Sequence, residues 1–380
     1  MYLAYLNHYD IRQCEAQYLY VLYEMLEKDI DAYCILNNEY LKKYTAQNRW
    51  EVRRVEQEWG KCENLLKKLN PQNYTVMEKI EKYIKAQVPS EILYKAVNTI
   101  IPEQVKVIED VIKKKNIKAG LTWVNNKTLK DTLAKYNIPT IHHEMGPFRP
   151  NIYIPTIYLD FSGVNGNTEF DKRFKEFLKI SKNVPILSKK ELIRVISPNH
   201  YHTLYKILDN KERTYDIGVG LQVEVDTNLL IFNNGRNWID PILSAKAESK
   251  GKILVRPHPS AGFIMKPDVR LTIDDLTKGS AQDFINKCNK IYCLNSSVGF
   301  EAILLGREAK IFGDSPFKNV CEMDEEHKVL ALNFAVFGYL IHRKFLFDKD
   351  YYDFRLNHIG NEKTIYMNNM EKLLKELKKN

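Results

Sequence analysis

A short apolar strand that stops at two prolines constrains this chain more than any other feature. Residues Lys252–Val255 are predicted as a short buried strand, because Ile-Leu-Val follows a Lys-Gly-Lys run, and the sequence continues as Arg256-Pro257-His258-Pro259. Because proline lacks a backbone N–H and has a fixed φ, the chain must leave the sheet here. His258 is therefore expected on a rigid turn at the carboxyl end of a strand, where open α/β sheets bind ligands.

The side chains of Arg256 and His258 in this turn are suited to bind an anionic ligand. A lone histidine is usually a packing or surface residue, but the position of His258 between two prolines favours a binding role. An imidazole can donate a hydrogen bond to a phosphate oxygen, and Arg256 adds a fixed positive charge. We therefore expect a phosphate or a similar anion at this strand end.

A second strand end follows about one βαβ unit later. The apolar run Ile291–Leu294 leads into residues 295–302, Asn-Ser-Ser-Val-Gly-Phe-Glu-Ala, and a third strand is expected at Ala309–Phe312. Ser296 and Ser297 can cap the helix that begins here, and a helix N-terminus with hydroxyl side chains is also a phosphate site. Glu301, one turn into this helix, could accept hydrogen bonds from ribose hydroxyls or only complement the helix dipole.

Apolar periodicity predicts the other elements. Strands are expected at Ala32–Leu36, Ile117–Val124, Ile138–His142, Tyr215–Val223 and, as a short one, Leu271–Ile273. Helices are expected at Tyr18–Leu26, Leu41–Leu69, Pro102–Lys115, Leu129–Tyr136, Phe170–Lys182, Trp238–Ala247, Ala281–Cys288, Glu325–Leu340 and Met370–Lys378, with Leu192–Leu208 partly helical.

This alternation predicts an α/β protein with two parallel sheets. With 380 residues the chain is long enough for two domains. The first is expected at 1–210, with a helical insertion at about 38–100 that is either structural or docks an acceptor or partner. The charged run 209–213 is the expected linker, the second domain follows at 211–345, and helices at 346–380 are expected to pack back on the first.

Composition narrows the class of protein. The chain has no apolar run of 18 residues and no secretory signal pattern at its first residues. Its six cysteines show no C-x-x-C spacing, which favours a reducing cytoplasm and disfavours a metal site. The net charge of +9 is spread over lysine-rich helix faces. Attraction to anionic lipid or an anionic acceptor is the alternative, while zinc spacing and RNP motifs for nucleic acid are absent.

Two carboxylates are candidates for catalysis. Asp226 and Glu144 each follow a predicted strand, one in each domain, and glycosyl chemistry uses two such groups as nucleophile or stabiliser and as acid or base. Asp226 could instead be a simple helix cap. His142 and His143 precede Glu144, but neighbouring residues of a strand point to opposite sides, so a metal site is not expected.

The polar loops at 142–150 and 158–167 are expected to form one wall of a cleft. Arg149 could pair with a substrate carboxylate in a bidentate way. Asp160 and Asn165 lie in a loop rich in turn formers, where Asp160 is more simply structural. Both loop residues remain weaker candidates for substrate contact.

These motifs together resemble those of the bacterial capsule and O-antigen β-Kdo glycosyltransferases, where Kdo is the acidic sugar 3-deoxy-manno-octulosonic acid. The resemblance rests on Gln222-x-x-x-Asp226, on Val-Arg-Pro-His-Pro at 255–259 and on Ser-Ser-x-Gly-Phe-Glu-Ala at 296–302. It covers about 218–317 and the loops at 144–149 and 160–165. The His-Pro and Ser-Ser elements alone also occur in CMP-sialic acid transferases and polyol-phosphate polymerases.

The resemblance implies a GT-B fold, two Rossmann-like domains that face a cleft, with CMP-Kdo bound by the second domain. It implies retention of configuration through an Asp226 glycosyl adduct, activation of the acceptor hydroxyl by Glu144, and neither metal nor cofactor. Arg256 stands where several relatives have lysine, which keeps the charge. The implied donor-binding residues are Gln222, Arg256, His258, Pro259, Ser296, Ser297 and Glu301.

Other functions stay open at this point. The donor could be another CMP sugar such as a sialic acid, or the enzyme could transfer glycerophosphate. The chain could also be a nucleotide-binding subunit without catalysis. Expected partners are a glycan or glycolipid acceptor and other glycan-assembly enzymes, with no nucleic acid. We expect a cytoplasmic location, with peripheral contact to the inner face of the inner membrane as an alternative.

Overall fold

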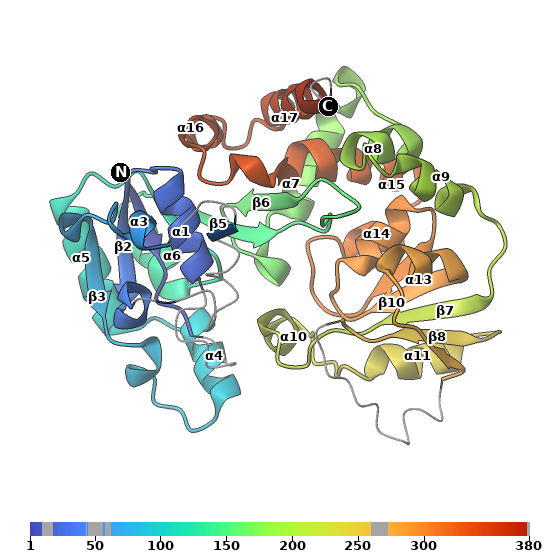
Figure 1. Cartoon of the computed structure of the whole chain (residues 1–380), viewed down its shortest axis with the longest axis horizontal. Coiled ribbons are helices and arrows are strands. Elements are labelled where there is room, and N and C mark those ends of the chain that lie inside the picture. Colours follow the sequence, from blue (N-terminus) through green and yellow to red (C-terminus); the bar gives the residue numbers. More distant parts are fainter. Residues whose placement is uncertain (10–17, 43, 45–55, 58–61, 260–272, 378–380) are drawn as a thin grey trace. The chain divides into compact units, whose positions relative to one another are not determined.

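A computed structural model describes residues 1–9, 18–42, 44, 56–57, 62–259 and 273–377. The chain divides into two compact units (Figure 1). The first unit comprises Met1–Glu144, Leu159–Val164 and Lys344–Asn357. The second unit comprises Met145–Tyr158, Asn165–Arg343 and His358–Asn380. The domain limits predicted at 210 and 345 stay predictions, and each unit is described by itself.

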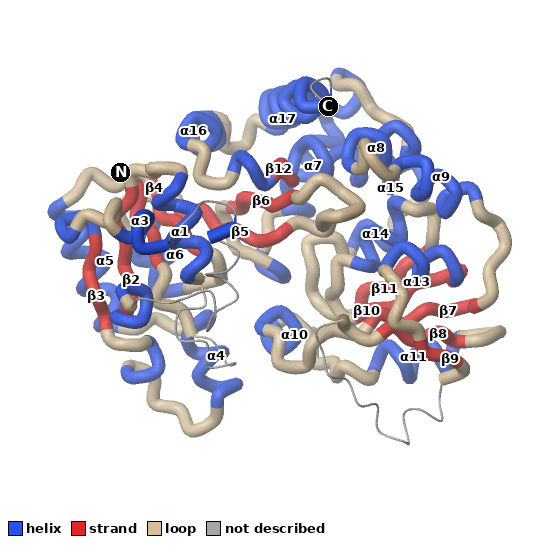
Figure 2. Tube along the Cα trace, viewed as in Figure 1, coloured by secondary structure: helices blue, strands red, loops and turns tan. Residues whose placement is uncertain are grey.

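The first unit is built on five parallel strands of a larger sheet, in which residues 156–158 and 340–342 belong to the second unit. A seven-stranded sheet has the order β12-β6-β5-β4-β1-β2-β3 (Figure 2). Strands β5, β4, β1, β2 and β3 pair in parallel, whereas β12 and β6 are antiparallel. The strands are β1 Tyr2–Tyr5, β2 Ala32–Asn37, β3 Tyr74–Met77, β4 Ala119–Thr122, β5 Thr140–Met145, β6 Thr156–Asp160 and β12 Leu340–His342.

Local sequence signals explain where the helices of the first unit begin. Proline occupies the first helical position of α4 and α5, where its missing N–H costs nothing. The Asn126 side chain caps α6 by accepting from the Leu129 N–H at 2.9 Å. The helices are α1 Leu19–Glu27, α3 Cys62–Leu66, α4 Pro89–Asn98, α5 Pro102–Lys114, α6 Lys127–Ala134 and α16 Lys349–Asn357, with short turns η1 Asn38–Leu41, η2 Pro71–Asn73 and η3 Ile80–Lys82.

The second unit contains a five-stranded parallel sheet in the order β11-β10-β7-β8-β9. Its strands are β7 Tyr215–Gly220, β8 Ile253–Arg256, β9 Asp275–Leu276, β10 Cys288–Cys293 and β11 Glu308–Ile311. Its α-helices are α7 Phe170–Ile180, α8 Lys189–Ile196, α9 Tyr201–Asp209, α10 Thr227–Ile231, α11 Asp240–Glu248, α13 Ala281–Lys287, α14 Val298–Leu304, α15 Glu325–Asn333 and α17 Glu362–Leu377.

Helices cover both faces of this sheet (Figure 1), and β7 shows why. Successive residues of a strand point to opposite faces. Ile217 and Val219 pack in the cluster that includes Ile242 of α11. Gly218 faces the other way, where an added Cβ would lie 2.8 Å from the Phe284 ring of α13. Glycine in β7 therefore lets α13 approach the sheet closely.

The predicted α/β class with two Rossmann-like units is confirmed, and most predicted elements after residue 100 are present. Strands β1, β3, β6 and β12 were missed. In β6, the prediction of a loop from 158 followed its turn-forming residues, whereas all five residues of this strand are buried. The predicted helix at 41–69 lies largely outside the described residues, as does most of the predicted strand at 271–273.

Two predicted segments are interrupted: 192–208, which was predicted as partly helical, and the helix predicted at 325–340. The stretch 192–208 is divided between α8 and α9, because Pro198 between them cannot continue a helix. The stretch 325–340 is α-helical only to Asn333, continues as the π-helix η7 (Phe334–Tyr339), and enters β12 at Leu340. Of the terminal helices, α16 belongs to the first unit and α17 to the second.

A buried ion pair fixes α17 to α7. Arg173 donates from Nε to Glu362 Oε1 at 3.0 Å and from Nη2 to Oε2 at 2.9 Å, and the two side chains are only 8% and 4% exposed. Nη2 also donates to the Gly338 carbonyl at 2.7 Å, which ties η7 to the pair. Both carboxylate oxygens are thus engaged by the guanidinium.

Breaking this pair should destabilise the second unit. Glu362→Ala leaves the Arg173 charge buried without its partner, so we expect a loss of about 3–5 kcal/mol in the free energy of unfolding. Urea denaturation followed by tryptophan fluorescence measures this loss. The control is Glu176→Ala, which removes the exposed Glu176–Lys179 pair of the same helix and should change little. Equal effects of the two substitutions would contradict the prediction.

Candidate nucleotide-sugar site

The strand β8 delivers Arg256 and His258 to the carboxyl edge of the second sheet. Arg256 is the last residue of β8, and its Nε donates to the Gly279 carbonyl at 2.9 Å. Burial and the nearby Arg256 charge lower the pKa of the half-buried His258, while the Asp226 carboxylate acts against this shift. These three charged groups, which the sequence placed in one site, thus interact within one unit.

Asp226 begins the helix α10. Its Oδ1 accepts a hydrogen bond from the Asn228 N–H at 2.8 Å, so the side chain is the N-cap of this helix. The capping role that the sequence left open is therefore present. A cap uses one carboxylate oxygen, and Oδ2 makes no hydrogen bond within the described part of the chain. The cap fixes the carboxylate in orientation without engaging both oxygens.

Gln222 and Asn295 join the ends of β7 and β10. Gln222 Nε2 donates to Asn295 Oδ1 at 2.8 Å, and the Asn295 N–H donates to Gln222 Oε1 at 3.0 Å. The buried Asn295 side chain also donates to the carbonyls of Asn228 and Phe232, at 3.0 and 3.2 Å. Gln222 thus holds the loop that carries Asp226, and its predicted donor contact stays a prediction.

The helix α14 starts directly after the two serines. Ser296 Oγ accepts from the Val298 N–H at 3.3 Å, whereas Ser297, the residue before the helix, makes no side-chain cap. The predicted serine cap is therefore Ser296 alone. Both serines are half-buried at the edge where β10 ends, and Pro259 is exposed after β8.

Glu301 is buried, and its predicted donor contact stays a prediction. It is 6% exposed, and one oxygen, Oε1, accepts from Tyr153 Oη and from Gln282 Nε2, both at 2.6 Å. Burial raises its pKa, while these two donors and the Arg256 charge lower it. Tyr153 and Gln282 were not predicted, since no local pattern links residues 148 positions apart.

The first unit holds Glu144 near the end of β5, half-buried, after two buried histidines. His143 Nδ1 donates to the Thr122 carbonyl at 2.8 Å, and Nε2 accepts from Tyr352 Oη at 2.6 Å. His142 Nδ1 lies 3.3 Å from the Asp160 carbonyl. The two histidines have different partners, and no group of three or more metal-ligating side chains exists among the described residues.

The weaker candidates for substrate contact lie in different units: Asp160 in the first, and Asn165 and Arg149 in the second. Asp160 is buried and accepts at Oδ1 from the N–H groups of Ser162 and Gly163, at 2.7 and 3.1 Å, which is the expected structural role. Asn165 has a left-handed φ of 59°, and its N–H donates to Tyr158 Oη at 3.1 Å. Arg149 is exposed in the second unit.

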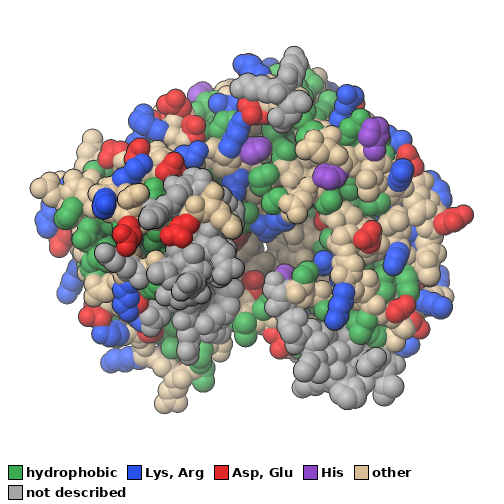
Figure 3. Space-filling view, viewed as in Figure 1, with side chains coloured by type: hydrophobic (Ala, Val, Ile, Leu, Met, Phe, Trp, Pro, Cys, Tyr) green, Lys and Arg blue, Asp and Glu red, His purple; other side chains and the backbone are tan. Residues whose placement is uncertain are grey.

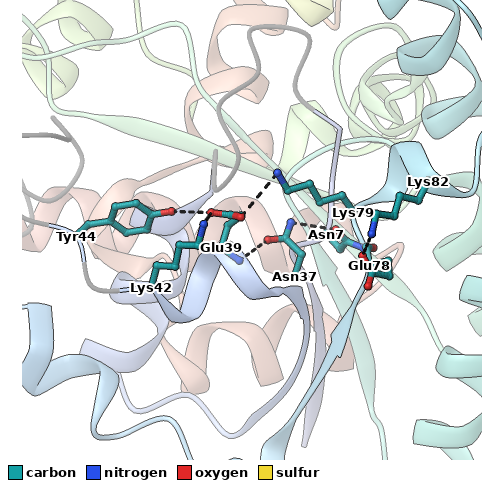
Figure 4. Close-up of polar contacts among 8 residues, drawn as sticks. All are labelled: Asn7, Asn37, Glu39, Lys42, Tyr44, Glu78, Lys79 and Lys82. Carbon is teal, nitrogen blue, oxygen red and sulfur yellow. Dashed lines mark hydrogen bonds and ion pairs between the residues drawn. The ribbon is translucent and has the colours of Figure 1, made fainter.

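A polar cluster missed by the sequence prediction lies at the carboxyl ends of β1, β2 and β3 (Figure 4). Buried Asn37 donates to Asn7 Oδ1 at 3.1 Å, and Asn7 donates to the Glu78 carbonyl at 2.9 Å. Glu39, with a side chain 10% exposed, pairs with Lys42 at 2.6 Å and with Lys79 at 3.8 Å. The first unit therefore also gathers charge at the edge where parallel sheets bind ligands.

Charge on the visible molecular surface is mixed. Lysine and arginine side chains are interspersed with acidic ones on this face (Figure 3), as solvated helix faces predict. No helix among the described residues is long and apolar enough to cross a bilayer.

The buried His143 should make stability depend on pH. Burial lowers its pKa from 6.5 to about 4, so the unfolded chain binds more protons between these values. Stability should therefore fall as the pH decreases from about 6.5 to 4, by up to about 1.4 kcal/mol per pH unit from this residue. His143→Gln should reduce this slope even though it lowers stability overall.

Thermal unfolding between pH 7 and 4 gives the slope for each variant. His202→Gln, at an exposed position of α9, is the control and should keep the slope of the unaltered protein. A slope that His143→Gln leaves unchanged would show that another group titrates.

The chain matches two known protein families. Residues 4–169 match the glycosyltransferase 99 family N-terminal domain, and residues 189–321 match the family described as capsule polysaccharide biosynthesis protein. No curated protein is significantly similar to the chain.

Several solved structures are similar at low identity. The β-Kdo 2,7 transferase of Thermosulfurimonas dismutans KpsC is 18% identical, with a TM-score of 0.43 over 62% of this chain and 82% of that chain. The β-Kdo 2,4 transferase of the same KpsC is 14% identical, with a TM-score of 0.41 over 64% and 90%. UDP-GlcNAc 2-epimerase from Neisseria meningitidis is 12% identical, with a TM-score of 0.29 over 99% of both chains.

The two family matches fall on the two halves of the chain in which the motifs were recognised, and both concern glycan synthesis. The resemblance stated from the motifs is thereby confirmed: the first part of the chain matches a glycosyltransferase family domain, and the second part matches a capsule polysaccharide biosynthesis family.

Proposed function

We propose that this protein transfers Kdo from CMP-Kdo to a growing bacterial surface glycan, with retention of configuration. The observation that carries the proposal is the grouping of Asp226, Arg256 and His258 at the carboxyl edge of the second sheet. This edge offers a carboxylate beside two cationic or hydrogen-donating side chains. The two KpsC structures to which the chain is similar are themselves β-Kdo transferases.

The donor is held mainly through its phosphate. His258 and Arg256 supply hydrogen bonds and positive charge, and Ser296 and Ser297 supply hydroxyls beside the start of α14. Gln222 and Pro259 shape the loops on either side. A metal is not required, because the leaving phosphate is met by the guanidinium and the imidazole.

The reaction proceeds in two displacements. An Asp226 oxygen forms a bond to the anomeric carbon of Kdo while the bond from that carbon to the phosphate oxygen breaks, and CMP leaves with the electron pair. An acceptor hydroxyl then attacks the same carbon, Asp226 leaves, and Glu144 takes the hydroxyl proton. Two inversions at one carbon give retention. The role of Glu144 rests on the family resemblance.

The acceptor is a glycan or glycolipid that the first unit binds. Among the described residues, Cys34, Cys62, Cys288, Cys293 and Cys321 form no disulfide, which supports a reducing, cytoplasmic setting. Contact with the inner membrane surface, and with other glycan-assembly enzymes, is part of the same proposal.

One observation favours a second candidate function. Asp226 caps α10, so this aspartate has a structural reason to be present even without catalysis. The alternative is a nucleotide-binding subunit that takes up CMP and transfers nothing. A transferase for another CMP sugar, including one for sialic acid or glycerophosphate, shares the binding edge and differs in the donor consumed.

Intact-protein mass spectrometry with CMP-Kdo generated in situ tests the proposal. The unaltered protein should gain the mass of one Kdo residue at Asp226, and Asp226→Ala and Asp226→Asn should not. We expect transfer by both variants to fall by at least about a thousandfold, because the nucleophile is absent.

The matched control is Asp324→Ala, which removes another aspartate N-cap, that of α15, bonded to the His327 N–H at 2.8 Å. It should cost about 1 kcal/mol of stability and leave transfer intact. CMP release without an adduct would indicate direct displacement, and CMP binding without any donor breakdown would indicate the subunit. A panel of CMP donors separates the Kdo enzyme from its relatives.

A further inference from the structure

Arg355 is a buried cation without a counter-charge in the described part of the chain. It lies in the last turn of α16 (Figure 1) and is 1% exposed. Its Nε and Nη1 atoms are enclosed and have no hydrogen-bond partner, and its guanidinium forms no ion pair with a described residue. Because arginine stays protonated in proteins, the first unit holds an unpaired charge at this position.

The two other buried arginines among the described residues have oxygen partners. Arg173 is bonded to the carboxylate of Glu362. Arg307, which is 5% exposed, donates to backbone carbonyls, among them that of Ile207 at 2.6 Å. Arginine is rarely fully buried unless it is paired, and enclosing an unpaired charge is costly. A ligand oxygen is therefore the partner that the environment of Arg355 calls for.

An aromatic ring on a well-anchored loop lies against Arg355. The guanidinium carbon is 5.7 Å from the centroid of the Phe161 ring, directly after β6. Asp160 Oδ1 accepts from the next N–H group along, that of Ser162, at 2.7 Å, and Lys130 Nζ donates to the Ser162 carbonyl at 2.6 Å. A ring attracts the cation but supplies no oxygen for its N–H groups. The loop thus orients the guanidinium and leaves its charge unbalanced.

The charge of this position selects the chemistry of the ligand. One enclosed positive charge is balanced by one negative charge, and the planar fork of a guanidinium matches the two oxygens of a carboxylate. A phosphate dianion would leave a negative charge in excess. The third nitrogen of Arg355, Nη2, is not enclosed like the other two, so a ligand reaches the guanidinium there.

We propose that Arg355 binds the carboxylate of a ligand of the first unit, and that Phe161 is a positioning residue that orients the guanidinium. A sugar acid is the ligand class, because both matched families concern glycans. The site goes beyond the proposed transfer and does not depend on it, since neither Asp226 nor the donor-binding edge takes part. Carboxylate binding balances the charge that the first unit encloses.

Thermal unfolding with glucuronate, glucose and inorganic phosphate, all at one ionic strength, tests the site. Glucuronate should raise the melting temperature of the unaltered protein by about 5–10 °C at about one hundred times its Kd. Glucose has the same ring without the carboxylate and should cause no rise. Calorimetric titration gives the Kd.

Arg355→Met removes the charge and keeps an apolar side chain of similar length. Without glucuronate it should raise the melting temperature by at least about 2 °C, because an apolar group replaces an unpaired buried charge. It should also abolish the rise caused by glucuronate. A merely structural arginine would do the opposite, since the loss of a stabilising contact lowers the melting temperature.

The matched control is Arg194→Met, which alters an exposed arginine of α8. The guanidinium carbon of Arg194 also lies 5.7 Å from an aromatic ring, that of Tyr201. This substitution removes the same charge and the same kind of ring contact from the surface. It should leave both the melting temperature and the glucuronate effect unchanged.

Three results would overturn the proposal: no effect of glucuronate on the unaltered protein, an unchanged glucuronate effect in Arg355→Met, or stabilisation by phosphate alone. If Arg355→Met does not fold, Arg355→Lys decides the matter. It keeps the charge and loses the planar fork, so glucuronate should bind at least about tenfold more weakly. Unchanged binding by Arg355→Lys would equally contradict the carboxylate site.

Discussion

Parallel pairing of β7 with β8 and β10 is the constraint on which the second unit depends. Strands that run in the same direction end at the same edge, so residues remote in sequence meet there without any further instruction. Arg256 follows from β8, Gln222 from β7 and Asn295 from β10. The two hydrogen bonds between Gln222 and Asn295 then hold the loops that follow β7 and β10 together.

Neutral side chains such as Asn295 fix the backbone at the carboxyl edge of the second sheet. The charged side chains at this edge, such as Asp226, remain available for binding and catalysis. Asn295 holds the backbone of α10 through the carbonyls of Asn228 and Phe232. Asp226 at the start of that helix uses one oxygen for its cap. A carboxylate oriented in this way keeps an oxygen for another partner, so capping and nucleophilic attack do not exclude each other. The same division occurs at Glu301, where Tyr153 and Gln282 orient one oxygen.

Sequence alone identified the groups that follow strand ends, because prolines and helix-capping residues mark these ends locally. His258, Asp226 and Ser296 were found in this way, and the α/β alternation gave the fold class. Tyr153 and Gln282 were not found, since their contact with Glu301 depends on tertiary packing. The burial of Glu301 was missed for the same reason: its position in the first helical turn says nothing about what covers it.

In the first unit, the alternation of polar and apolar residues fails to mark a strand. Strand β1, Tyr2–Tyr5, is buried along its whole length, so no alternation of polar and apolar residues marks it. Its central place between β2 and β4 brings Asn7 to the edge beside Asn37. Those two amides anchor the turn that carries Glu39, whose Lys42 and Lys79 partners give the cluster a net positive charge. A carboxylate thus fixes two lysines at the edge of the first unit's sheet, whereas neutral donors fix a carboxylate at the edge of the second unit's sheet.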